Sequence, residues 1–128
     1  MSKKRDYKEI EAEFEQALRM RDEGKLAEAE ELLLNLAERY PEAAFIQGIL
    51  GDIQERRGRI AEAAASYRRA TERSSASEVA SISLFHALYQ LGDLEGALAE
   101  MRRFRRRGAP SPMYDELIRD LKVGGAEE

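Results

Sequence analysis

The sequence lacks several residue types on which protein chemistry often depends. Its 128 residues include no cysteine, no tryptophan and a single histidine, His86. The absence of cysteine excludes disulfides, zinc–thiolate sites and thiol catalysis, and one histidine cannot form a multi-histidine metal site or a pair of imidazole acid–base groups. There is also no phosphate-binding glycine loop, nucleophile elbow or paired-histidine motif. We therefore expect a protein that is not an enzyme and that uses no cofactor or metal.

Long apolar runs and a strong charge of one sign are also missing. The chain has 21 basic and 25 acidic residues, a net charge of −4, and this near-balance argues against a nucleic-acid partner. Its apolar stretches, around 32–36 and 49–50, are far shorter than a membrane span, and no apolar segment of a signal peptide follows the charged start. We expect no membrane partner and a cytoplasmic location.

An internal repeat organises the chain. Three glycines recur at one constant interval, with a large aliphatic residue two positions after each glycine and an alanine five positions after it. The nine residues are Gly24, Leu26 and Ala29; Gly58, Ile60 and Ala63; and Gly92, Leu94 and Ala97. Coincident spacings of this kind indicate one structural unit repeated three times.

Each unit has the pattern of a helical hairpin. Apolar residues follow each glycine at steps of three and four, as in Leu26, Ala29, Leu33 and Leu36, and a second segment with the same period precedes each glycine. The glycine between two helices suits the position after a helix end, where φ is positive. The pattern therefore predicts a helix, a tight turn and a second helix in every unit.

A 34-residue helical hairpin with small residues at these places resembles the tetratricopeptide repeat family. The second unit matches best, through Leu50, Gly51, Gly58, Ala63, Tyr67 and Ala70. The resemblance implies an all-α, right-handed α-α superhelix of about seven helices. Its parts are an extension of the first helix (1–9), three units within 10–111 (10–43, 44–77 and 78–111), a capping helix (112–123) that Ser111 and Pro112 open, and a flexible tail (124–128).

The chain departs from the family pattern at several positions. No unit carries the family's tryptophan, and Glu13, Gln47 and Ser81 stand in its place. The first helix has Gln16 where leucine is usual, and Phe85 occupies a normally small site. The apolar residues of the first helix are rotated relative to their counterparts; they are Ile10, Phe14, Ala17 and Leu18.

The resemblance also implies a binding groove. In this family the first helix of each hairpin lines the concave surface, where a peptide or helix of a partner lies. The positions carried over to this chain that we expect to bind a partner are Phe14, Leu18, Phe45, Ile49, Asp52, Arg56, Val79, Ile82, His86 and Tyr89. The lysine, asparagine and arginine set that clamps a chaperone's C-terminal carboxylate is absent, because Phe14, Leu18, Asp52, Val79 and Ser83 occupy its places.

Six of the groove positions form an apolar streak: Phe14, Leu18, Phe45, Ile49, Val79 and Ile82. Apolar residues exposed together usually mark an interface, and an amphipathic helix or extended apolar segment would fit it. The alternative is that core packing, or the rotation of the first helix, buries several of them. We expect a non-enzymatic scaffold or adaptor for another protein. The alternative function is self-association as a structural, assembly or chaperone-like homo-oligomer through the same groove.

The arginine cluster and the single histidine can each be interpreted in two ways. An arginine cluster at the end of the third unit comprises Arg102, Arg103, Arg106 and Arg107. It is either a solvated face that complements the helix C-terminus or a secondary basic patch for an acidic partner, with RNA less favoured. His86 could act as a general base, but no serine, cysteine or aspartate is arranged around it at a known spacing. We therefore interpret it as a surface or groove residue.

Overall fold

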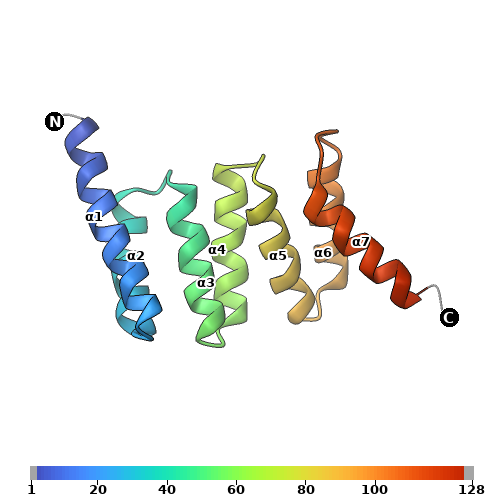
Figure 1. Cartoon of the computed structure of the whole chain (residues 1–128), viewed down its shortest axis with the longest axis horizontal. Helices are drawn as coiled ribbons and strands as arrows, with labels where there is room; N and C mark the ends of the chain where they lie inside the picture. Colours follow the sequence, from blue (N-terminus) through green and yellow to red (C-terminus); the bar gives the residue numbers. More distant parts are fainter. Residues whose placement is uncertain (1–2, 126–128) are drawn as a thin grey trace.

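The computed structural model describes residues 3–125, which form seven α-helices and no strand (Figure 1). The helices are α1 (Lys3–Asp22), α2 (Leu26–Arg39), α3 (Ala44–Arg56), α4 (Ile60–Arg73), α5 (Glu78–Gln90), α6 (Leu94–Arg105) and α7 (Pro112–Gly125). The prediction of an all-α fold with about seven helices is confirmed. Helices α3 and α5 begin at the first residues of the predicted second and third units.

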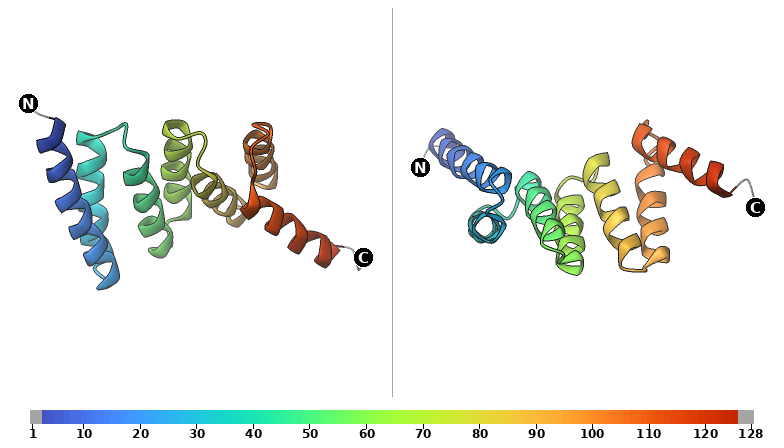
Figure 2. Two further views of the ribbon diagram at one scale, coloured as in Figure 1. Left: turned by 45° about the horizontal axis from the view of Figure 1, so that its top comes forward. Right: turned by 60° about the horizontal axis from the view of Figure 1, so that its bottom comes forward.

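The helices form two layers that follow the chain. In Figure 1, α1, α3, α5 and α7 lie on the near side, with α2, α4 and α6 behind them. Each helix from α1 to α5 packs against the next one, whereas α7 packs mainly against α5. In the right-hand view of Figure 2, α1 and α7 rise at opposite ends above α3 and α5, so the layer of odd-numbered helices is concave.

Glycines end the first helix of every hairpin. Gly24, Gly58 and Gly92 have φ values of +82°, +79° and +83°, a conformation that costs roughly 1 kcal/mol or more for other residues. The turns are closed by backbone hydrogen bonds, such as that from the amide of Lys25 to the carbonyl of Met20 at 2.8 Å. The predicted role of the glycines is confirmed. Gly108, with φ +74°, follows the end of α6 in the same conformation, although it lies outside the repeated spacing.

The core consists of two clusters that small residues allow to pack closely. One cluster joins α1, α2 and α3 and includes Leu33, Leu36 and Leu50; the other joins α4, α5, α6 and α7. The repeated alanines Ala29, Ala63 and Ala97 are fully buried. The structure therefore uses the repeated alanine to bring the two helices of each hairpin together.

Polar side chains occupy the positions where the family carries tryptophan. In the second unit, Gln47 Oε1 accepts a hydrogen bond from Arg69 Nε at 3.0 Å, and Ser66 Oγ accepts one from the same guanidinium at 3.2 Å. In the first unit, Glu13 forms an ion pair with Arg39 of α2. Hydrogen bonds between helices thus replace the packing of a large aromatic ring.

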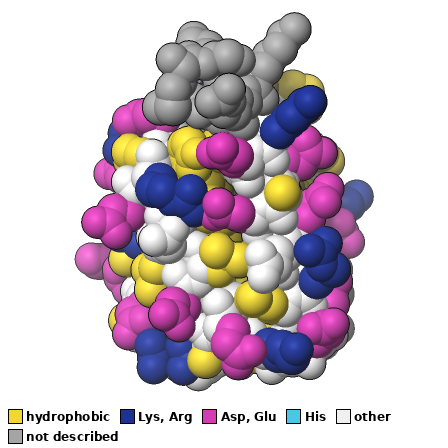
Figure 3. Space-filling view, turned by 90° about the vertical axis from the view of Figure 1, so that its left-hand side faces the viewer, with side chains coloured by type: hydrophobic (Ala, Val, Ile, Leu, Met, Phe, Trp, Pro, Cys, Tyr) yellow, Lys and Arg dark blue, Asp and Glu magenta, His cyan; other side chains and the backbone are white. Residues whose placement is uncertain are grey.

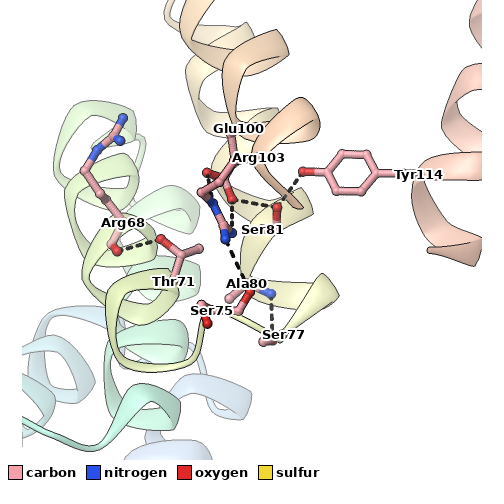
Figure 4. A network of polar contacts seen from close by, with 9 residues as sticks. All are labelled: Arg68, Thr71, Ser75, Ser77, Ala80, Ser81, Glu100, Arg103 and Tyr114. Carbon is pink, nitrogen blue, oxygen red and sulfur yellow. Dashed lines mark hydrogen bonds and ion pairs between the residues drawn. The ribbon is translucent and has the colours of Figure 1, made fainter. Parts of the chain in front are cut away.

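The third unit repeats this arrangement at the equivalent positions (Figure 4). Ser81 Oγ donates to Glu100 Oε2 at 2.6 Å, and Arg103 donates to both oxygens of Glu100 at 2.9 and 2.6 Å. Because the Ser81 proton is used in this way, the hydroxyl of Tyr114, 2.7 Å away, donates to Ser81 Oγ. The network therefore connects α5, α6 and α7.

Phe85 is accommodated because α7 supplies an aromatic neighbour. Its ring is buried and lies 6.0 Å from the ring of Tyr114, edge to face. Tyr114 is fully buried and also contacts Phe104, with the ring centroids 5.8 Å apart. A large side chain at this position in α5 thus fixes the capping helix.

The ends differ from the predicted boundaries. Helix α7 continues to Gly125, so the glycines at 124 and 125 lie within the helix rather than in a flexible tail. Residues 126–128 of that predicted tail, and residues 1–2 of the predicted N-terminal extension, lie outside the described residues. Seen from the α1–α2 end, the described surface has scattered apolar side chains among charged ones (Figure 3).

The apolar pattern of α1 is rotated because one side of this helix is exposed and carries polar residues. Gln16 and Arg19 are exposed, whereas Leu50 and Ile53, which occupy the equivalent repeat positions in α3, are buried. Within the described residues no other helix covers this side of α1. Polar residues at the outer face of a helical repeat keep the end of the stack hydrated.

Candidate groove for a partner segment

A groove of about 690 Å³ opens on the concave layer. Helices α1, α3 and α5 supply most of its walls, and α4 with the turn that follows it supplies the rest. Its lining residues are Phe14, Arg21, Ala44, Phe45, Gly48, Ile49, Asp52, Tyr67, Ala70, Ser74, Ser77, Val79, Ala80 and Ser83. The volume lies in the range of pockets that bury ligand groups.

Five of the ten predicted partner-binding residues line this groove. They are Phe14, Phe45, Ile49, Asp52 and Val79. These five residues could be predicted from the repeat spacing, because it places equivalent positions of α1, α3 and α5 on the same side of the layer.

The other five predicted residues lie elsewhere. Ile82 belongs to the core and is only 8% exposed, so its assignment to the exposed apolar streak was wrong. Leu18 is half-buried on α1. Arg56 is exposed and reaches the groove through its contact with Asp52. His86 and Tyr89 are exposed near the end of α5, and both rings pack against Phe85.

Exposed apolar side chains form the two walls. Phe45, at the start of α3, is 49% exposed and Val79, at the start of α5, is 63% exposed. The rings of Phe14 and Phe45 meet edge to face with centroids 4.9 Å apart, a contact that aromatic quadrupoles favour. This pair joins α1 to α3 and leaves much of the Phe45 ring free to contact another molecule.

A small charged cluster closes one end of the groove. Asp52 accepts hydrogen bonds from Arg21 at 3.4 Å and from Arg56 at 3.3 Å. Arg21 also contacts Asp22 at 3.2 Å. The charged side chains at this end of the groove therefore already form ion pairs with one another. An unpaired charge that could attract a partner must lie at another position.

The contribution of α4 has no counterpart in the sequence-based expectations. Tyr67 and Ala70 form part of the groove, although the groove was expected to use only the first helices of the hairpins. Burial raises the pKa of Tyr67, and the carboxylate of Glu55, which accepts a hydrogen bond from its hydroxyl at 3.0 Å, acts in the same direction. The ring therefore remains neutral at physiological pH and serves as an apolar surface with one fixed hydrogen bond.

The predicted basic patch is not a single free surface. Arg103 is bound to Glu100, and the guanidinium of Arg107 lies 5.1 Å from the centroid of the Phe104 ring. Arg102 and Arg106 are exposed and border a shallow hollow of about 390 Å³ with Met101 and Arg105.

Neither a metal cluster nor a membrane span is found in the described part of the chain. Among these residues, no group of three or more histidine, aspartate or glutamate side chains is placed to hold a metal ion. No helix in this part of the chain is long and apolar enough to cross a membrane.

Known structures share this fold. A point mutant of MamA has 21% sequence identity and a TM-score of 0.67, and the match covers 77% of this chain and 72% of MamA. The type III secretion translocator chaperone SycD of Yersinia enterocolitica has 18% identity and a TM-score of 0.74, over 89% of this chain and 79% of SycD. A complex of SycD with a peptide of the translocator YopD gives a TM-score of 0.76 at 18% identity, over 91% of this chain and 88% of SycD.

Sequence comparison identifies the family. No curated protein sequence matches the chain. The tetratricopeptide repeat profile matches residues 14–78, which comprise half of the chain and include the second, best-matching unit. Together with the paired helices, the glycine turns and the buried alanine ladder, this match shows that the chain belongs to the tetratricopeptide repeat family.

Proposed function

We propose that the protein is a non-enzymatic interaction module that binds a segment of another protein in the concave groove. The observation that carries this proposal is the position of Phe45 and Val79, two large apolar side chains that are about half or more exposed on opposite walls of one groove. Exposed apolar groups that line a common depression favour a protein partner. Buried polar side chains such as Gln47, Gln54 and Ser81, by contrast, are engaged in hydrogen bonds between helices.

The structural neighbours support a peptide ligand for this fold. SycD has been solved with a peptide of YopD bound. At 18% identity this similarity concerns the fold alone, so the partner and its sequence are independent questions for this chain. A cytoplasmic location, and division into units at 10–43, 44–77 and 78–111, also remain part of the proposal.

The test is a charge placed on each wall. Phe45→Glu combined with Val79→Glu would put two carboxylates into the apolar groove while changing only exposed side chains. We expect the variant to lose binding to peptides selected from a random-peptide phage library on the wild-type protein. Circular dichroism should show unchanged helicity, because neither residue is buried.

A matched control separates the groove from general surface effects. Leu34 on α2 and Leu94 on α6 are 48% and 53% exposed but do not line the groove. Leu34→Glu with Leu94→Glu should bind the selected peptides as the wild type does. Equal loss of binding in both double variants, or undiminished binding by the groove variant, would contradict the proposal.

Self-association through the same groove is the alternative use of these residues. It predicts a dimer or larger species in light scattering that Phe45→Glu with Val79→Glu converts to a monomer. A monomeric wild type at high concentration would exclude stable self-association and leave a different protein as the partner.

A further inference from the structure

One position in the floor of the groove has no side chain. The repeat spacing relates Phe14 of α1, Gly48 of α3 and Ile82 of α5. The first and third are large and apolar, whereas a Cβ atom built on Gly48 would have no heavy atom within 4 Å. The groove therefore has a notch at Gly48, whereas Phe14 fills its own position in the same groove and Ile82 lies in the core.

Neither backbone conformation nor close packing requires glycine there. Gly48 lies inside α3 and does not have a positive φ. Glycine inside a helix costs about 1 kcal/mol relative to alanine. What glycine does provide at this position is space within the groove.

The walls of this notch are apolar. Phe14, Phe45, Ile49 and Val79 line the same groove as Gly48. Phe45 and Val79 have exposed surface to cover. A large aliphatic or aromatic side chain of a bound segment would cover this surface. A polar or charged side chain in the same place would lose its hydration without gaining a hydrogen bond in return.

Acidic residues predominate at the repeat positions of the concave face. At the positions of α1 and α3 that the repeat spacing assigns to the concave face, carboxylates outnumber guanidinium groups by five to two: Glu11, Glu15, Asp22, Asp52 and Glu55 against Arg21 and Arg56. Both arginines are bound to Asp52, and Glu11 and Glu15 are exposed. The concave positions of α5 carry no carboxylate, lysine or arginine.

Arginines are concentrated instead in the second helices of the second and third hairpins. Residues 60–73 of α4 contain three arginines, and residues 94–107, from the start of α6, contain five. The concave positions thus have an excess of carboxylates beside the apolar residues of the groove, while arginines are in excess on α4 and α6 of the opposite layer. Complementary potentials favour a partner of positive charge.

We infer that the groove binds a basic amphipathic segment, one bulky apolar side chain of which enters the notch at Gly48 while its lysine or arginine residues face Glu11, Glu15 and Glu55. This inference rests on the proposed function and specifies the chemistry of its ligand. Burial of one large apolar side chain strengthens binding by about 10- to 100-fold. The carboxylates add an attraction that salt weakens.

The experiment begins with the random-peptide phage library selected on the wild-type protein. The enriched peptides should carry a net positive charge and a recurring bulky apolar residue. Synthetic versions are then titrated by fluorescence anisotropy against Gly48→Leu, which fills the notch, and Gly48→Ala, which adds one methyl group. We expect Gly48→Leu to weaken binding by about 10- to 100-fold and Gly48→Ala to weaken it by much less.

Charge is tested with a matched pair of variants. Glu11→Gln with Glu15→Gln removes two exposed carboxylates near the groove, and Glu28→Gln with Glu31→Gln removes two exposed carboxylates of α2. Only the first pair should weaken binding by severalfold and flatten its dependence on salt. Both pairs lower the net negative charge equally, so an equal effect would indicate non-specific attraction and overturn the inference.

The outcomes distinguish this inference from the proposed function. Peptides that are acidic or uncharged, or that bind Gly48→Leu as tightly as wild type, would overturn the inference. If Phe45→Glu with Val79→Glu still abolished their binding, the groove would remain the binding surface. If no peptide were enriched, or if binding ignored that double variant, both proposals would be wrong.

Discussion

Two glycines of α3 lie three residues apart but have different surroundings, and they should respond in opposite ways to alanine. Gly48 faces the open groove, and its added methyl group would have no neighbour within 4 Å. Gly51 faces α4, and its added Cβ would lie 2.6 Å from Cε1 and 2.7 Å from Cδ1 of Tyr67. The helix gains the same intrinsic propensity at both positions, so the difference between the variants reports the surroundings alone.

The magnitudes follow from this contrast. Gly48→Ala should raise the free energy of unfolding by about 1 kcal/mol, the difference in helix propensity. Gly51→Ala gains the same amount but forces the Tyr67 ring to move, and overpacking typically costs about 1–3 kcal/mol. Tyr67 is buried and its hydroxyl is bound to Glu55, so the ring cannot turn away freely. The net result should be a loss of about 1 kcal/mol, the overpacking cost less the propensity gain.

Urea unfolding followed by far-ultraviolet circular dichroism measures both values. A double variant, Gly51→Ala with Tyr67→Leu, provides the control, because it removes the ring atoms with which the new methyl group collides. In the Tyr67→Leu background the Gly51→Ala change should become neutral or stabilising. Changes of the same sign for Gly48→Ala and Gly51→Ala in the wild-type background would refute this description of the two faces of α3.

The remaining predictions concern the attachment of α7 and the tyrosine that provides it. Tyr114→Ala should lower the free energy of unfolding by about 3–5 kcal/mol, because it leaves a cavity beside Phe85 and Phe104. Tyr114→Phe should lower it by about 1 kcal/mol, because only the hydrogen bond to Ser81 is lost. Urea unfolding and amide exchange in α7 measure both effects, and equal losses would contradict the structure. Burial raises the pKa of Tyr114 to about 12, above the usual value of about 10, so the unfolded chain loses this proton at lower pH than the folded one. The free energy of unfolding should therefore fall as pH rises from 10 through 12, and the fall should be smaller in Tyr114→Phe; a profile that is flat, or unchanged by this substitution, would refute the assignment.

The parts of the fold that depend on local geometry could be predicted from the sequence. Gly24, Gly58 and Gly92 are followed within two residues by the start of a helix, and each adopts the positive φ that the turn needs. The repeated alanines are buried because a hairpin of this kind has one close approach between its helices. These features recur at one spacing, so each repeat confirms the interpretation of the others.

The residues that line the groove could be predicted only in part, because they depend on how successive hairpins stack. The repeat spacing does not determine this stacking. Ile82 shares its repeat position with Phe14 and Gly48, yet it lies in the core whereas those two line the groove. Tyr67 reaches the groove from α4 because Gly51 allows its ring to lie close to α3. Such contacts arise between helices and leave no periodic signal within either one.

The arginine cluster shows a second limit. Arg103 stands beside Arg102 in the sequence, but it is bound to Glu100 within the Ser81 network while Arg102 remains exposed. Arg103 also donates to the backbone carbonyl of Ser75 at 3.3 Å, and its partner Glu100 accepts a hydrogen bond from Ser81. Ser75 and Ser81 are both distant from Arg103 in sequence. A charge pattern alone therefore could not separate the structural arginine from the free one.

The central claim is that the concave groove binds the partner segment. Amide chemical shifts of isotope-labelled protein, recorded by nuclear magnetic resonance during titration with a phage-selected basic peptide, test it most directly. We predict that the largest changes occur around Phe14 of α1, from Phe45 to Asp52 of α3, and around Val79 of α5. Chemical-shift changes confined to Arg102 and Arg106, two exposed arginines at the C-terminal end of α6, would contradict the claim. They would place the binding surface on the opposite layer.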